Sequence, residues 1–150
     1  MTLDQFYEVI DYAIEREVEA AEFYKDLQSS ASLQSSKELL RELELMEQGH
    51  IKVLKNFNTQ KLENFVPPKI PNLKLSETME ILVPNSEMTF QEILIIGMKR
   101  EEQAYKLYSL LAEETEDEQT KLLFIKLASE ESKHKFQLES IYDDEVLKEN

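Results

Sequence analysis

The chain has 150 residues and a mass of 17.6 kDa, which suits one domain with a single core. Its 17 basic and 31 acidic side chains leave a formal charge of −14, which argues against nucleic acid and anionic membranes as partners. The absence of cysteine excludes disulfides, thiolate-bound metals and a thiol nucleophile. The two glycines, Gly49 and Gly97, are too few for a glycine-rich phosphate loop or a dinucleotide fingerprint. Because the N-terminus is acidic and the longest apolar run, 93–98, is too short to span a bilayer, we expect a cytoplasmic protein.

Four segments carry apolar residues at alternating three- and four-residue steps, the period of a helix that buries one face. The first segment covers residues 3–27 and opens with a capping-box pattern formed by Thr2 and Gln5. The second covers residues 39–57 and follows a serine-rich, turn-like stretch. These two segments predict one helical hairpin over about residues 2–57.

The remaining two segments predict a second hairpin, over about residues 86–142. Apolar residues recur over 90–111, behind Thr89 or Ser86 as the cap, and again over 124–141. For the last helix we expect Thr115 to be the cap, in a second capping-box pattern with a glutamate three residues later.

The connection between the hairpins, residues 58–85, contains all four prolines and shows helical period only in a short turn around 76–81. Bundle loops usually have 2–8 residues, so a connection of this length indicates a crossover along the bundle. We therefore predict an all-α, antiparallel four-helix bundle of two hairpins, forming one domain over residues 1–150.

The two hairpins are also related in sequence. Shifting the chain by 84 positions aligns residues 6–54 with the second half without a gap, and 13 of these 49 pairs are identical. This similarity indicates a duplicated hairpin and a bundle with pseudo-twofold symmetry.

Six residues of metal-ligand type occupy the apolar stripes of the four predicted helices. Each of the two histidines follows a glutamate by three residues, so each pair lies on one helix face. The first and third helices each add one glutamate at an apolar position, and these two also correspond in the repeat. The candidate ligands are Glu17, Glu47, His50, Glu101, Glu131 and His134.

Four carboxylates on core faces would repel one another unless they were protonated or neutralised by cations. Two divalent ions would cancel their charge. Carboxylate and imidazole ligands without sulfur favour iron or manganese, and zinc is also compatible, whereas the histidines disfavour calcium. One glutamate from each of two helices with Glu-x-x-His from each of the others is the known arrangement of ferritin-like di-metal bundles, and we apply it here.

Small and aromatic residues surround the candidate ligands at helical spacing. Alanine or glycine lies one turn before and after each single glutamate, which we expect to leave room for metals and a small ligand; these residues are Ala13, Gly97, Ala20 and Ala104. Tyr24 and Tyr108 each follow a glutamate by seven residues, so their hydroxyls could reach the opposite carboxylate. Packing alone would also explain both tyrosines.

The segments AIEREVEAAEFY, ELMEQGHIKVL, IGMKREEQAYKLYSLLAEE and KLASEESKHKFQLESIYDD resemble the rubrerythrin branch of the ferritin-like superfamily. The resemblance implies two iron ions, with Glu17 and Glu101 as terminal ligands. It implies that Glu47 and Glu131 bridge the ions and that His50 and His134 bind one ion each.

The sequence departs from full rubrerythrins in two respects. Those proteins have a further glutamate one turn after the third-helix ligand, where this chain has Ala104. This chain therefore lacks the glutamate that takes part in their redox-linked ligand exchange. They also carry a cysteine-rich rubredoxin domain as their electron entry, and this chain has no cysteine.

The resemblance implies an oxidoreductase that reduces hydrogen peroxide or dioxygen with electrons from a separate donor protein such as a rubredoxin. Two alternatives stay open: a ferroxidase or iron-handling protein, and a non-enzymatic metal-binding protein. We also expect a homodimer, because Val18, Phe23, Ile95 and Ile96 are apolar but lie off the ligand stripe.

Overall fold

The computed structural model describes residues 1–59, 65–68 and 82–146. These residues form four long helices and no strand: α1 (Leu3–Gln28), α2 (Gln34–Thr59), α4 (Phe90–Glu114) and α5 (Glu118–Glu145). The predicted all-α, four-helix class is confirmed. None of the helices in the described part of the chain combines the length and the apolar character needed to cross a membrane.

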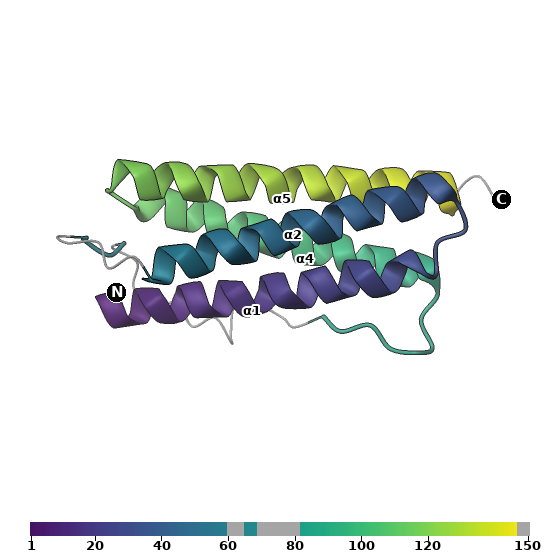
Figure 1. Ribbon diagram of the computed structural model, residues 1–150, viewed down its shortest axis with the longest axis horizontal. Coiled ribbons are helices and arrows are strands. Elements are labelled where there is room, and N and C mark those ends of the chain that lie inside the picture. Colours follow the sequence, from purple (N-terminus) through teal and green to yellow (C-terminus); the bar gives the residue numbers. More distant parts are fainter. Residues whose placement is uncertain (60–64, 69–81, 147–150) are drawn as a thin grey trace.

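The helices form two antiparallel hairpins that pack side by side (Figure 1). Helix α1 packs chiefly against α2, and α4 against α5, while contacts of α1 with α4 and of α2 with α5 join the hairpins. Helix α4 begins at the end of the bundle opposite to that at which α2 ends, and α4 runs antiparallel to α1, as a crossover between the hairpins requires. The short helical turn predicted around 76–81 lies outside the described residues.

The N-terminus of α1 has the predicted capping box. The backbone N–H of Gln5 donates to Thr2 Oγ1 at 3.1 Å, and the Thr2 backbone N–H donates to Gln5 Oε1 at 2.8 Å. Of the two candidates for α4, the cap is Thr89, whose hydroxyl oxygen accepts the N–H of Glu92 at 3.1 Å. Both caps satisfy backbone donors that the first helical turn leaves unpaired.

The predicted cap of α5 was wrong. Asp117 caps this helix, and its Oδ2 accepts the backbone N–H of Thr120 at 2.9 Å and the hydroxyl of the same residue at 2.6 Å. These hydrogen bonds lower the pKa of Asp117. Thr115 instead follows the last residue of α4, is buried, and donates its hydroxyl to the carbonyl of Leu111. Asp117 is the cap because it directly precedes the first helical residue of α5.

A carboxylate at the far end of α5 fastens the turn of the first hairpin. Glu145 is buried and accepts the backbone N–H groups of Ser32, at 3.1 Å, and Leu33, at 2.7 Å. Since Ser32 and Leu33 directly precede α2, this contact ties the start of α2 to the second hairpin.

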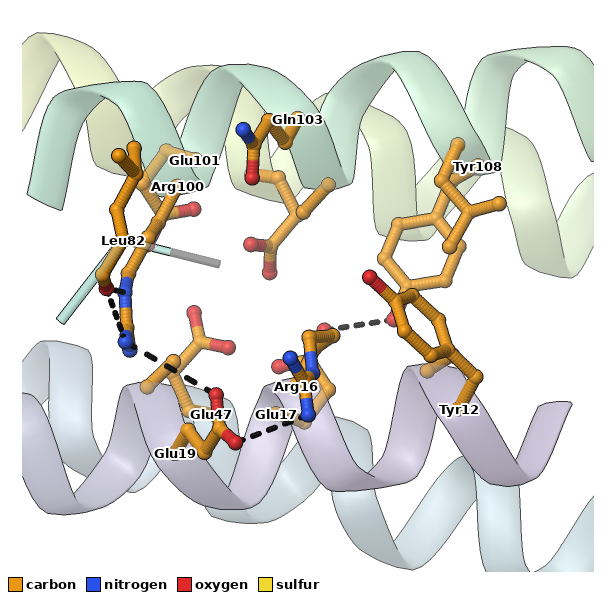
Figure 2. Close-up of a pocket in the computed structure, with 15 residues that line it drawn as sticks. Tyr12, Arg16, Glu17, Glu19, Glu47, Leu82, Arg100, Glu101, Gln103 and Tyr108 are labelled. Atoms are coloured by element: carbon orange, nitrogen blue, oxygen red, sulfur yellow. Dashed lines mark hydrogen bonds and ion pairs between the residues drawn. The ribbon is translucent and has the colours of Figure 1, made fainter. Parts of the chain in front are cut away.

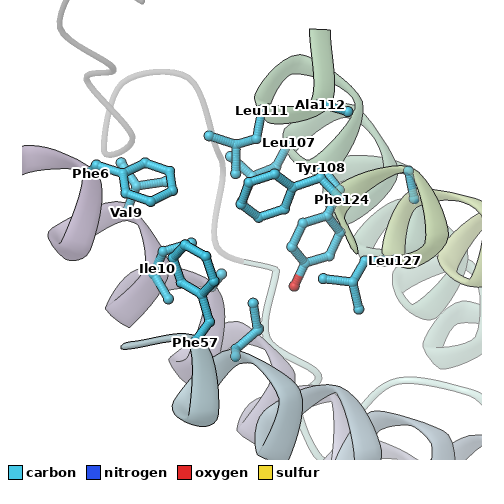
Figure 3. Close-up of a cluster of buried hydrophobic side chains, with 13 residues drawn as sticks. Phe6, Val9, Ile10, Phe57, Leu107, Tyr108, Leu111, Ala112, Phe124 and Leu127 are labelled. Carbon is cyan, nitrogen blue, oxygen red and sulfur yellow. The ribbon is translucent and has the colours of Figure 1, made fainter. Parts of the chain in front are cut away.

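The core has three layers along the bundle. A polar layer that includes the buried Glu17, Glu47 and Glu101 lies between the helices (Figure 2). One apolar cluster, around Phe6, Phe57 and Phe124, lies towards the N-terminal end of α1 (Figure 3). A second cluster, around Leu27, Leu40 and Ile141, lies towards the C-terminal end of α1. The polar layer is therefore closed by apolar packing at both ends.

Two of the residues expected on a second contact surface are instead part of the core. Phe23 and Ile96 are each only 8% exposed and belong to the second apolar cluster, whereas Val18 and Ile95 are exposed. The Phe23 ring occupies the space left open by the missing side chain of Gly97, where an added Cβ would lie 3.0 Å from Phe23 Cε1. Gly97 therefore makes room for Phe23, and not for metals as we expected.

Candidate metal centre

All six sequence-predicted ligands meet in the polar layer. Helix α1 supplies Glu17 and α4 supplies Glu101, while α2 and α5 each supply a glutamate and a histidine one turn apart. Every one of the six is buried, with at most 4% of its surface exposed. Burial of four carboxylates is strongly unfavourable without compensating positive charge.

The ligand atoms form two groups, within each of which all atoms lie within 4.8 Å of one another. Glu47 and Glu131 belong to both groups. Glu17 and His50 complete the first group, and the second is completed by Glu101 and His134. Each group thus offers three carboxylates and one imidazole, a donor set suited to iron, manganese or zinc.

The two imidazoles point their Nδ1 atoms at carboxylates from the opposite hairpin. His50 Nδ1 lies 2.8 Å from Glu131 Oε1, and His134 Nδ1 lies 2.7 Å from Glu47 Oε1. The rings are nearly parallel, with an interplanar angle of 15° and centroids 5.8 Å apart. The two contacts join residues that correspond in the 84-residue repeat.

Many polar atoms of the centre lack hydrogen-bond partners of acceptable geometry, although several lie close to one another. Buried atoms are normally hydrogen-bonded, so such a concentration requires a further partner. Cations at the centre of each group would satisfy these atoms, and the residues present therefore fit two metal ions. The unpartnered atoms include Glu17 Oε2, both carboxylate oxygens of Glu47, Glu101 Oε2, Glu131 Oε1 and the Nδ1 atoms of both histidines.

The pKa values of the glutamates reflect this crowding. Burial, together with the charge of Glu47, raises the pKa of Glu17 well above its usual value. Burial raises the pKa of Glu131 in the same way, helped by the charges of Glu101, Glu47 and Glu17. Burial would also raise the pKa of Glu47, but Glu17 and the two imidazoles outweigh it and hold that pKa below its usual value.

The pKa values of both histidines are raised, whereas burial in apolar surroundings lowers the pKa of a histidine. Burial lowers the pKa of His50, but the adjacent carboxylates of Glu17 and Glu47 raise it to about 11. Burial likewise lowers the pKa of His134, and Glu101 and Glu47 raise it to about 9. In the metal-free centre, protons on the histidines therefore supply the positive charge that metals would otherwise supply.

Each tyrosine reaches the single glutamate of the opposite hairpin. The Tyr108 hydroxyl donates to Glu17 Oε1 at 2.7 Å, and the Tyr24 hydroxyl donates to Glu101 Oε1. Both tyrosines are 1% exposed. Burial and the neighbouring carboxylate raise the pKa of each hydroxyl, so both stay protonated and act as hydrogen-bond donors.

A cavity of about 50 Å³ reaches the centre between α1 and α4 (Figure 2). All four candidate glutamate ligands line it, as do Ala13, Ala20 and Ala104, but neither histidine does. A water molecule needs at least about 10–15 Å³ of such volume, so the cavity admits a few waters or one small molecule.

Two arginines that correspond in the repeat also line the cavity. Arg16 binds Glu19 at 2.9 Å, and Arg100 lies 3.9 Å from the same glutamate. Arg100 also donates from Nε to the carbonyl of Leu82 at 2.8 Å, which attaches the end of the crossover to α4. Sequence analysis assigned these arginines no role, although their identity in the repeat was a signal.

Sequence analysis also missed Glu130, which directly precedes the candidate ligand Glu131. Its Oε2 forms a hydrogen bond with Nε2 of His50, the ring nitrogen that faces away from the metal groups. Nothing in the spacing of Glu130 distinguishes it from the many other glutamates, because the contact joins α5 to α2.

A four-helix bundle with this carboxylate and histidine centre is a ferritin-like protein. A family model described as Rubrerythrin matches residues 8–142, and the chain therefore belongs to the rubrerythrin family. This membership implies a di-iron site. A search of curated proteins found no match.

Among solved structures, the hypothetical protein Pfu-1136390-001 from Pyrococcus furiosus is similar to this chain. It is 29% identical, the match covers 92% of this chain and 88% of that chain, and the TM-score is 0.70. The similarity supports the same fold over nearly the whole of both chains.

Proposed function

We propose that this protein is a di-iron oxidoreductase that reduces hydrogen peroxide, with electrons from a separate donor protein. The observation that carries the proposal is the cavity, which is small, reaches all four carboxylates and excludes both histidines. A small oxidant entering there would meet the carboxylate side of the centre. Two iron ions held by the six ligands would supply two electrons and positive charge to the oxidant.

The reaction converts hydrogen peroxide, two electrons and two protons into two molecules of water. In this scheme the apolar clusters at both ends of the centre exclude bulk water. Tyr108 and Tyr24 hold Glu17 and Glu101 in place through their hydroxyls. As their raised pKa values keep them protonated, the tyrosines act by orienting these carboxylates.

Two guanidinium groups, of Arg16 and Arg100, and five carboxylates line the cavity, so its charge does not separate a neutral oxidant from iron ions. The choice between the peroxide reductase and the ferroxidase therefore rests on the reactions with peroxide and with air.

Ala104 lines the same cavity, at the position where full rubrerythrins have a further glutamate. With one carboxylate fewer at the centre, we expect slower peroxide reduction than in those proteins. Because this chain has no cysteine, we infer that electrons come from an external cytoplasmic donor such as a rubredoxin.

We also propose a twofold dimer, with the exposed Val18 and Ile95 in its interface, which light scattering at micromolar concentration would test.

The decisive experiment is stopped-flow mixing of the anaerobically Fe(II)-loaded protein with peroxide and, separately, with air. We expect oxidation by peroxide to be much faster than by dioxygen, and turnover to require an added donor. Glu101→Ala should abolish the reaction, whereas Glu102→Ala, on the partly exposed neighbouring residue, should leave it unchanged. Repeated consumption of Fe(II) in air with retained ferric mineral would favour the ferroxidase, and no reaction with either oxidant would leave the non-enzymatic alternative.

A further inference from the structure

The two histidines correspond in the repeat, yet their outer ring nitrogens have different surroundings. Nε2 of His50 is hydrogen-bonded to the carboxylate of Glu130. Nε2 of His134 is buried and has no hydrogen-bond partner among the described residues. The two halves of the centre therefore have the same kinds of ligand, but only His50 has a hydrogen-bond partner at Nε2.

The repeat explains how this difference arises. Glu130 lies 84 positions after Met46, so Met46 on α2 occupies the place that corresponds to Glu130 on α5. A thioether is a much weaker hydrogen-bond acceptor than a carboxylate. Met46 is 41% exposed, so packing in the core does not account for methionine at this position.

A hydrogen bond at the outer nitrogen has a defined effect on a metal-binding histidine. The histidines face the carboxylate groups through Nδ1, so metal binding requires the remaining proton to be on Nε2. A carboxylate that accepts this proton fixes the tautomer, orients the ring and makes it a stronger donor to the metal. Loss of such a partner typically lowers metal affinity by about 10- to 100-fold.

We propose that Glu130 is a positioning residue that makes the two metal positions unequal. The position completed by His50 and Glu17 is the tighter one and fills first, and the position completed by His134 and Glu101 fills second. This inference rests on the proposed metal centre, and it assigns an order of loading to it.

The test compares variants that retain one position each. Glu101→Ala leaves the position that Glu130 supports, and Glu17→Ala leaves the other one. Anaerobic calorimetric titration with Fe(II) should show about 10- to 100-fold tighter binding to the Glu101→Ala variant than to the Glu17→Ala variant. Adding Glu130→Leu to each should abolish the difference.

Further variants separate positioning from a general effect on folding. Glu130→Gln retains an acceptor without the charge, and should recover part of the affinity that Glu130→Leu loses. Met46→Glu should tighten the second binding step of the otherwise wild-type chain, because it places a carboxylate at the position that corresponds to Glu130 in the repeat. Glu139→Leu removes a carboxylate from the same helix, outside the centre, and should change neither step. The unfolding temperature of the metal-free variants serves as the control for folding.

Each result bears on a separate claim. Two metals bound with equal affinity by the wild type, or an unchanged ratio after Glu130→Leu, would overturn the proposed role of Glu130 and leave the metal centre intact. No binding of metal to the wild type would overturn the centre itself, and the loading order with it.

Discussion

Loading the metal-free protein with two divalent ions should release at least two protons per chain at neutral pH. In the metal-free centre, His50 and His134 are protonated, because nearby carboxylates raise their pKa values to about 11 and about 9. Burial and neighbouring carboxylates also raise the pKa values of Glu17 and Glu131, so the loss of positive charge on the histidines would leave the centre strongly repulsive.

Metal binding needs neutral imidazoles and ionised carboxylates. Two divalent ions balance the charge of four carboxylates, so the imidazolium protons are no longer needed and leave. Calorimetric titration in buffers with different ionisation enthalpies measures the number of protons released. Release of fewer than two protons by the wild type would refute the reasoning, because the histidines alone account for two.

The same protons give the metal-free and metal-loaded proteins opposite responses to pH. Unfolded histidines lose their protons near pH 6.5, whereas His134 and His50 keep theirs up to about pH 9 and about pH 11. The folded metal-free state thus binds more protons than the unfolded state, and its stability falls as pH rises above about 6.5, by up to about 1.4 kcal/mol per pH unit for each histidine. Metal affinity rises over the same range, because binding expels protons. Urea unfolding between about pH 6 and pH 9 should show that the metal-free protein loses stability as pH rises, while the stabilisation by bound metal increases. If stability changed with pH in the same way in both forms, the assignment of the protons would be contradicted.

Three further predictions concern single residues and metal removal. Chelation of the metals should lower the unfolding temperature at neutral pH, because metal binding to the folded state alone stabilises it by mass action, and an unchanged temperature would argue against a buried centre. Tyr108→Phe should slow peroxide reduction without lowering the metal content measured by elemental analysis, because its hydroxyl orients Glu17 and is not itself a ligand. Gly97→Ala should be less stable than Gly49→Ala in urea unfolding by about 1–3 kcal/mol, since a Cβ at Gly97 meets the Phe23 ring at 3.0 Å, whereas Gly49 has nothing within 4 Å and gains about 1 kcal/mol of helix propensity. Equal gains from both alanines would show that the Phe23 ring moves aside without cost.

Sequence alone was enough to predict the helices, the hairpins and the set of candidate ligands. Helical periodicity is local, so apolar positions three and four residues apart define the buried face before any partner helix is known. The glutamate three residues before each histidine places both side chains on that face for the same reason. The repeat of 84 residues then links Glu17 to Glu101 and His50 to His134 without reference to coordinates.

The tertiary structure decided what depends on contacts between helices. Periodicity left Phe23 and Val18 alike as apolar residues off the ligand stripe, but only Phe23 is buried, because Gly97 on α4 makes room for its ring. The partner of His50 was equally hidden: Glu130 lies 80 residues away on another helix, and only the packing of α2 against α5 brings their side chains together. Spacing along one helix specifies the face on which a residue lies, whereas the angle and distance between helices determine which residue it meets.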